Sequence, residues 1–463
     1  MHRWANRMLK GALWLVGIVF GLALAFYGAL LFINRHDRPA VATVLQFEAL
    51  QRSLPVVAAA DNGYVYFMGL AGPKDGDPPA LGAQRIEWIE RQLVAGDSSS
   101  VPEFPGTMHA EPIPRKQALG QLTSACKKLN DACIDALAAN QEGLAEWLAE
   151  DGWRLDRYAT LLKFRAWRET LPFDERIPVP RYTDLLDGQT LYLVKAYSLA
   201  ARGDHKAVRA MLEDDVRFWR RYLASTDSLI GKMIAGAGLR NHFDYGGRVL
   251  RTLAPAKTLA AVPALWREPM SAAERSMSRP LMGEWRHSDA LMRKLKKSGA
   301  VAGNGGGNAM TALGDQLMLR MLQAQESSNR NAENLAALST SLLVSYPELK
   351  AFAAQKRAPK PERSLLSFDA YNMLGSVLMA AAEPQFDTYG FRIADLEGIR
   401  RLTLLAIELR GHAVSEAAIA GELGASKLNN PYDGTPFLLD PGGHAIVFIG
   451  LDQRKPGCTV VPY

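Results

Sequence analysis

An uncharged run of 23 residues, at positions 11–33, constrains this chain more than any other feature. At about 1.5 Å of rise per residue, a helix of that length is about 35 Å long, enough to cross a hydrocarbon core about 30 Å thick. The run is longer than the apolar region of a secretory signal, and Phe32-Ile33-Asn34-Arg35 is not a small-residue cleavage site. The sequence therefore predicts a retained single-pass transmembrane helix, with the remaining chain on one side of a membrane.

The basic residues around this span indicate its orientation. Arg3, Arg7 and Lys10 precede the span, whereas Arg35 and Arg38 follow it. Loops on the cytoplasmic side of membrane proteins carry an excess of Lys and Arg. This bias predicts a cytoplasmic N-terminal tip. Together with the cysteine pair described below, it predicts a bacterial inner-membrane protein with a periplasmic body, or a body on an equivalent non-cytosolic face.

A stripe of small residues runs along the predicted span. Gly17, Gly21, Ala25 and Ala29 recur every four residues and share one face of the helix. Such a face lets a second helix approach closely, which predicts self-association or a protein partner in the membrane. The alternative is the ordinary abundance of Gly and Ala in membrane spans.

The three cysteines bear on the compartment. On one continuous helix, Cys126 and Cys133 would lie about 10 Å apart, too far for a disulfide. The intervening Leu129-Asn130-Asp131 can form a turn, and an oxidising compartment favours the bond. We predict a Cys126–Cys133 disulfide in an exported body, with two buried free thiols as the alternative, and Cys458 unpaired.

Composition argues against nucleic acid as a partner. The formal net charge is +6, but the basic residues are scattered, and the tight clusters are Lys127-Lys128 and 293–297. Nucleic-acid-binding proteins concentrate such charge on one face and interleave aromatic residues. The hydrophobic share of 48% is ordinary for a globular protein with one added span.

Helical periodicity recurs from about residue 86 to 423 and predicts a mainly α fold, a stacked-helix, α-solenoid-like body. Two segments differ. The run 64–69 is aromatic and β-branched between turn residues, which predicts a strand. Residues 436–451 alternate around Pro441-Gly442-Gly443, which predicts a β-hairpin. We expect both segments to join in one small antiparallel sheet, built from the two ends of the body.

Composition shifts divide the chain into consecutive stretches. They are the tip and anchor (1–34), a linker and short helix (35–60), an N-terminal helical body (61–297), a Gly-rich loop (298–308), a C-terminal helical body (309–428) and a β-hairpin tail (429–463).

The tail carries a resemblance. A Leu- and Arg-rich helix from about Leu396 is followed by Asn430-Pro431-Tyr432-Asp433-Gly434-Thr435-Pro436-Phe437, the predicted hairpin and Gly450-Leu451-Asp452. This stretch resembles the C-terminal module of a broad group of uncharacterised bacterial single-pass envelope proteins, with D-P-[FY]-x-G-x-P-L before the hairpin and G-x-D at its end. The chain departs from that pattern at Asn430 and Phe437. The resemblance implies the same address and architecture and assigns no catalytic residues.

Candidate metal ligands are few. Glu284 and His287 are spaced as Glu-x-x-His, which places both on one helix face, as in helical di-metal sites. Those sites need a second such motif, and the sequence contains none. His242 and Asp244 are two residues apart and would point away from each other on a helix. We predict no metal and no cofactor, and we favour an ion pair or cap at Glu284 and His287.

A weak groove is predicted from Trp- and Arg-bearing helices. Arg217, Trp219 and Arg220, together with Glu284 and His287 on another helix, would line it for an anionic or glycan-like ligand. Ordinary packing of Arg stems over aromatic rings is the alternative and the one we favour.

No catalytic motif stands out. A serine hydrolase would need a nucleophile on a sharp turn such as Gly-x-Ser-x-Gly, which the sequence lacks. We therefore predict an interaction or scaffold component of the cell envelope. The alternatives are a periplasmic hydrolase acting on an envelope polymer and a small-ligand receptor.

Overall fold

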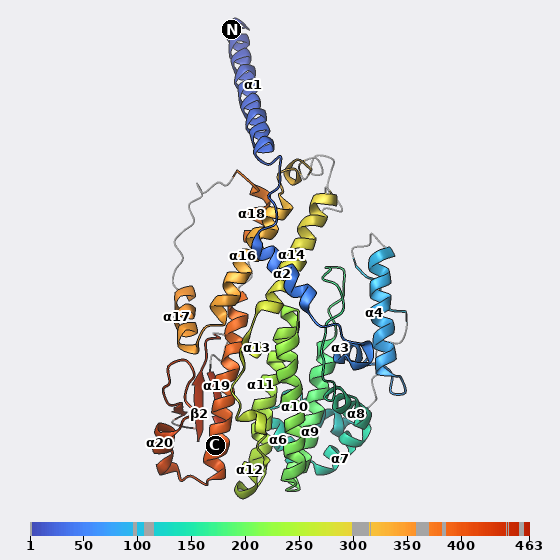
Figure 1. The fold of residues 1–463 in the computed structure, drawn as a ribbon, viewed down its shortest axis with the longest axis vertical. Helices are drawn as coiled ribbons and strands as arrows, with labels where there is room; N and C mark the ends of the chain where they lie inside the picture. The colour runs from blue at the N-terminus through green and yellow to red at the C-terminus, as the bar shows by residue number, and fades with distance from the viewer. Residues whose placement is uncertain are drawn as a thin grey trace. The chain divides into compact units, whose positions relative to one another are not determined.

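The computed structural model describes residues 2–95, 100–105, 115–298, 314, 316–357, 370–381, 386–440, 442, 444–452 and 458–463. Within this part of the chain the fold is mainly helical, with one small antiparallel sheet near the C-terminus (Figure 1). The predicted fold class is confirmed.

The chain forms two compact units, each assembled from separated segments. The span unit comprises Met1–Leu54, Trp285–Ala336 and Pro359–Pro384, and the body unit comprises Pro55–Glu284, Ala337–Ala358 and Gln385–Tyr463. This division differs from the consecutive stretches expected from composition. The Gly-rich loop 298–308 lies, beyond Ser298, outside the described residues.

The span unit contains α1 (His2–Ile33), α2 (Ala42–Ser53), α18 (Met373–Ala381) and parts of α14 (Ser278–Ser298) and α16 (Ala324–Leu342). Its small core consists of Met292, Leu295, Leu319, Leu322, Ala324 and Leu374. On α2, Phe47 packs on Trp285 with ring centroids 5.6 Å apart. These contacts join segments that lie far apart in the sequence.

Helix α1 holds the one segment, Lys10–Ile33, that is long and apolar enough to cross a membrane among the described residues. Its side chains are almost all exposed; Trp14, for example, is 75% exposed. An apolar surface of this size is not stable in water, so α1 is a membrane anchor or an export signal. The small-residue stripe is exposed on α1, and its role in helix pairing stays a prediction.

The body unit is a pack of helices around α11. Its helices are α3 (Gly63–Met68), α4 (Pro78–Ala95), α5 (Gln117–Ala125), α6 (Asp131–Ala139), α7 (Gln141–Glu150), α8 (Gly152–Leu161), α9 (Tyr182–Ala201), α10 (His205–Ser225), α11 (Leu229–Thr252), α12 (Pro255–Ala261), α13 (Ala272–Arg275), α17 (Tyr346–Arg357), α19 (Phe386–Gly411) and α20 (Glu416–Ala425), with the 3-10 turns η1 (Ala59–Asp61) and η2 (Ala264–Trp266). Helix α11 packs against α9, α10 and α19. At Gly238 the ring of Trp219 occupies the place of a Cβ, so glycine lets α10 and α11 approach closely.

Helices α9 and α10 form a hairpin. Gly203 ends α9 with φ +76°, a left-handed conformation that costs glycine little. Asp204 then caps α10, because its side chain accepts a hydrogen bond from the backbone N–H of Ala207.

The strand predicted at 64–69 is wrong, because this segment is helix α3. Asn62 caps the helix by accepting from the N–H of Tyr64, and it also exchanges two hydrogen bonds with the backbone of Arg168. Every residue of α3 is buried, and Phe67 stacks on Tyr182 at 5.2 Å between ring centroids. Aromatic and β-branched residues favour strands only locally, and here tertiary packing overrides that preference.

The sheet comes from the tail alone, in the order β1-β2-β3, so the expectation that 64–69 joins it is also wrong. Its strands are β1 (Leu438–Asp440), β2 (Ala445–Ile449) and β3 (Cys458–Pro462). The predicted hairpin is confirmed as β1 and β2, with Leu439 opposite Ile446. Strand β3, which was not predicted, pairs antiparallel with β2. The Phe448 ring packs onto α19 at Gly398, where no Cβ would fit.

The Cys126–Cys133 disulfide is confirmed, with Cα atoms 4.6 Å apart. The helix breaks between the two cysteines, and Asn130 caps the start of α6 by accepting from the N–H of Cys133. Cys458 is a free, half-buried thiol in β3. Disulfides persist in oxidising compartments, so the bond indicates a body outside the cytoplasm.

Candidate functional site

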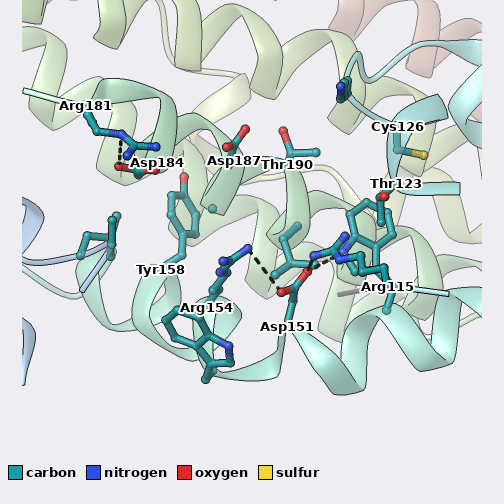
Figure 2. A pocket seen from close by; sticks show the side chains of 17 residues that line it. Arg115, Thr123, Cys126, Asp151, Arg154, Tyr158, Arg181, Asp184, Asp187 and Thr190 are labelled. Atoms are coloured by element: carbon teal, nitrogen blue, oxygen red, sulfur yellow. Dashed lines mark hydrogen bonds and ion pairs between the residues drawn. The ribbon is translucent and has the colours of Figure 1, made fainter. Parts of the chain in front are cut away.

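A pocket of about 940 Å³ opens in the body unit (Figure 2). It is bounded by α5, α7, α8, α9 and the turn at Leu70 and Ala71. Its charged lining consists of Arg115, Lys127, Asp151, Arg154, Arg181, Asp184 and Asp187. Concave sites with a few convergent polar groups are where proteins usually bind ligands, so this pocket is the candidate site.

One wall of the pocket is organised by Asp151. This carboxylate is 3% exposed, and its Oδ2 accepts hydrogen bonds from Arg115 and, at 2.9 Å, from Trp147 Nε1. The Arg154 guanidinium lies 3.5 Å from its Oδ1. Two guanidiniums thus share one carboxylate, which leaves this wall with one net positive charge.

The opposite wall is the first part of α9 and carries acidic groups. Arg181 Nε lies 3.4 Å from Asp184 Oδ2, and Asp187 follows one turn later, next to Thr190 (Figure 2). Partial desolvation in the pocket and the neighbouring Asp184 carboxylate raise the pKa of Asp187. The pocket is therefore polarised, with cationic groups on one wall and a carboxyl group on the other.

The disulfide is part of the pocket wall. Cys126 lines the pocket together with Thr123 and Lys127, at the end of α5. Cys133 is fully buried, with its Sγ 3.6 Å from the Tyr245 hydroxyl on α11. The bond therefore ties the wall that presents Lys127 to the centre of the body unit.

A buried hydrogen-bond network lies behind the pocket and reaches it through Tyr158. The Tyr158 hydroxyl donates to Asp215 Oδ1 at 2.6 Å, and Trp219 Nε1 donates to the same oxygen at 3.2 Å. Gln189 Nε2 donates to Asp215 Oδ2 at 3.1 Å. Burial and the Asp215 carboxylate raise the pKa of Tyr158 well above its usual value.

The same network contains an Asp–His pair. His242 Nδ1 lies 2.7 Å from Asp215 Oδ2, and Trp266 Nε1 lies 2.7 Å from His242 Nε2. An indole N–H can only donate, so Nε2 is the acceptor and Nδ1 carries the proton. Both ring nitrogens are engaged and both residues are fully buried, so the pair holds helices together and is not placed to serve as a base in the pocket.

The predicted groove is wrong for Trp219 and Arg220, because both side chains are buried in the body unit. Arg220 Nη2 donates at 3.0 Å to Glu274 Oε2 and at 2.7 Å to the Pro269 carbonyl. Arg217 lies on the surface of α10 and pairs with Asp214 and Glu213 of the same helix. The favoured alternative, ordinary packing, fits Trp219 and Arg220.

Glu284 and His287 lie one turn apart on α14, and both are half-buried. Among the described residues, no group of three or more His, Cys, Asp or Glu side chains is placed to hold a metal ion. His242 and Asp244 point apart as expected: His242 is buried against Asp215, and Asp244 pairs with Arg248.

Lys232 is a buried ammonium group near the Arg220–Glu274 ion pair. Its side chain is 1% exposed, and Nζ donates at 2.7 Å to the carbonyl oxygens of Leu223 and Glu274. Burial lowers the pKa of Lys232 to about 7, against a partial opposing effect of the Glu274 carboxylate. Folding therefore removes a proton from this group over part of the pH range.

We expect the free energy of unfolding to rise by about 2 kcal/mol between pH 7 and 9 because of Lys232. In that window the unfolded lysine is protonated and the folded one loses its proton, so the unfolded state binds more protons. Lys232→Met should abolish this contribution, whereas Lys206→Met, at an exposed site of α10, should retain it. Urea unfolding of the full chain in micelles at pH 7 and at pH 9 measures this change in the free energy of unfolding. An equal change for Lys232→Met and for the wild type would refute the prediction.

The residues of the tail motif stabilise the C-terminal fold. The Tyr432 hydroxyl donates to Asp395 Oδ1 at 2.6 Å, and the N–H groups of Leu451 and Asp452 donate to the same carboxylate at 2.8 and 2.9 Å. Asn430 Oδ1 accepts from the N–H of Tyr432 at 3.0 Å. These hydrogen bonds hold the tail against α19. Burial raises the pKa of Asp395 above its usual value.

Comparisons with protein-family models, with curated proteins and with solved structures find no match to this chain. The resemblance of the tail to envelope proteins stays a prediction.

Proposed function

We propose that this chain is a bacterial envelope protein that binds a segment of a partner in the pocket between α8 and α9. In this proposal α1 is a retained span of the inner membrane, the N-terminus is cytoplasmic and the body unit lies in the periplasm. The apolar, exposed Lys10–Ile33 and the Cys126–Cys133 bond support this address. The protein is an interaction component, as the sequence predicts.

The polarised lining of the pocket carries the proposal. Asp151 is already held between Arg115 and Arg154, so the cationic wall is ordered before a ligand arrives. Lys127 adds a further positive charge to the lining, and Asp187 faces the pocket from α9. A carboxylate or phosphate would pair with the first wall, and an ammonium or amide N–H would pair with Asp187. An extended peptide segment offers both groups.

Site-specific crosslinking in intact cells tests this proposal. A photoreactive residue replaces Thr190 in the pocket or, as a control, the exposed Arg209 on α10. We expect a crosslinked partner at position 190 alone, and a loss of at least tenfold when Asp187→Lys reverses the charge of one wall. Equal capture at both positions, or capture that is insensitive to Asp187→Lys, would refute binding in the pocket.

A hydrolase acting on an envelope polymer is the second candidate, and Asp187 is the observation that favours it. A carboxyl group with a raised pKa beside a second carboxylate is the usual arrangement of a general acid. If this candidate is correct, the purified full chain in micelles releases soluble fragments from isolated cell-wall polymer, and Asp187→Asn abolishes the release. Absence of release by the wild type rejects it.

A further inference from the structure

Helix α18 is an apolar helix with an open face. Its sequence, MLGSVLMAA, has one polar residue, Ser376, whose hydroxyl accepts from Arg330 Nη1 at 3.1 Å. Leu374 packs into the core of the span unit, whereas Val377 is 59% exposed and Ala380 is also exposed. Met373, Val377 and Ala380 share one face because they are four and three residues apart. A helix that faces water normally presents polar residues there, so this face calls for an apolar partner.

The start of α18 is tied to the end of α1 through Asn34. Asn34 is 4% exposed, and its Nδ2 donates at 2.8 Å both to the Leu30 carbonyl of α1 and to the Ala370 carbonyl. Its Oδ1 accepts from the N–H of Asn372 at 2.7 Å. One side chain thus joins the last turn of α1 to the residues that immediately precede α18.

A second contact places another segment beside the span. The Tyr27 hydroxyl donates to the Leu317 carbonyl at 3.0 Å. Tyr27 precedes the end of α1 by six residues, about 9 Å along the helix axis. Met318, the next residue after Leu317, is 38% exposed. Leu317 and the residues that immediately precede α18 therefore lie beside the last turns of α1.

Basic residues lie around the same core. The C-terminal part of α14 contributes Met292 and Leu295 to that core and carries the exposed Lys294 and Lys297. Lys296 lies 3.6 Å from Asp37, four residues after the span. Arg35 is also exposed at this end of α1. Basic groups beside an apolar surface suit lipid phosphate groups, and each is worth about 1 kcal/mol near an anionic surface.

We infer that the α18 face, defined as Met373, Val377, Ala380 and Met318, lies in the lipid interface and that the neighbouring basic residues bind phosphate groups of anionic lipids. The inference rests on the proposed retention of α1 as a span and adds a second membrane contact to it. We call Arg35, Lys294, Lys296 and Lys297 the basic border of this face. A lipid surface fits both the apolar face and the basic border at the end of a span. The span unit then sits on the membrane and is not merely tethered to it.

Fluorescence quenching by lipid-borne nitroxides tests the inference on the full chain. In a Cys458→Ser background that keeps the disulfide, single cysteines replace Val377, Leu22 of α1 or the exposed Val94 of α4. Each variant is labelled with a small fluorophore and placed in nanodiscs containing phosphatidylglycerol and a nitroxide lipid. We expect quenching of the probe at position 377 to be at least half of the quenching at position 22. We expect little quenching at position 94.

The outcomes separate the inference from the anchor. Quenching at 22 with a value at 377 equal to that at 94 overturns the inference and leaves the anchor standing. No quenching at 22 overturns both. Shielding of 377 from aqueous iodide without nitroxide quenching shows that protein covers the face and also overturns the inference.

The basic border has its own test. The double variant Lys294→Gln, Lys297→Gln should lower quenching at position 377 at least twofold and leave quenching at position 22 unchanged. Replacing phosphatidylglycerol with phosphatidylcholine should have the same two effects. Lys206→Gln on α10 is the matched control. If neither change alters quenching at 377, the binding of anionic lipid by these basic residues is removed from the inference.

Discussion

Replacing Arg157 with Met is expected to lower the free energy of unfolding by about 3–5 kcal/mol. The guanidinium is buried, with 8% of the residue exposed, and donates to five backbone carbonyls between Leu70 and Gly76 at 2.5–3.2 Å. It also lies 4.7 Å from the centre of the Trp153 ring. Met cannot donate, so the substitution leaves several of these carbonyls without a partner.

Arg154→Met is the matched control for this experiment. Arg154 lies on the same helix and over the same ring, at 5.0 Å, but its side chain is 40% exposed. Its loss should cost about 1 kcal/mol or less. Urea unfolding of the full chain in micelles, followed by Trp fluorescence, compares the two variants. Equal losses of stability would show that the carbonyl contacts of Arg157 contribute little.

Asp215→Ala is expected to have an effect of similar size, about 3–5 kcal/mol. It removes the acceptor of the Tyr158 hydroxyl, of one amide N–H of Gln189 and of Nδ1–H of His242. The Trp219 indole loses one of its two acceptors and keeps the Tyr158 hydroxyl at 3.0 Å. Asp215→Asn should also destabilise, because its amide N–H groups would face donors. His242 cannot adapt by moving its proton, since Nε2 must accept from Trp266.

The neighbouring Asp214 supplies the control. Asp214 is exposed and pairs with Arg217 on the same helix, so Asp214→Asn should change the free energy of unfolding by about 0.5 kcal/mol or less. The same urea titration measures all three variants. If Asp215→Asn is as stable as Asp214→Asn, the donor arrangement around Asp215 is not the one described.

Much of the architecture could be predicted because its signals are local. The span, the α9–α10 hairpin with Gly203 and Asp204, and the β1–β2 hairpin each depend on residues within a short stretch. The disulfide was predictable because Asn130 breaks the helix between its cysteines. Helix α3 was not, since its burial depends on Trp167 and Tyr182, which come about a hundred residues later.

The pocket was beyond prediction for the same reason. Arg115 pairs with Asp151 across 36 positions, and Arg220 with Glu274 across 54. Arg217 and Arg220 are one turn apart on α10, yet one is exposed and the other buried, and the local pattern does not distinguish them. The spacing of Arg181, Asp184 and Asp187 at the start of α9 was the one local signal of the pocket.

Under the proposed export, the position of Cys126 in the pocket wall implies an order of events during maturation. In the reducing cytosol the two thiols stay separate, so a newly made chain would carry an unfinished wall. Under the proposed export, oxidation comes after translocation, and Lys127 takes its final place only then. The chain would be inert toward its ligand while it is being synthesised and competent once it has reached the compartment where it works.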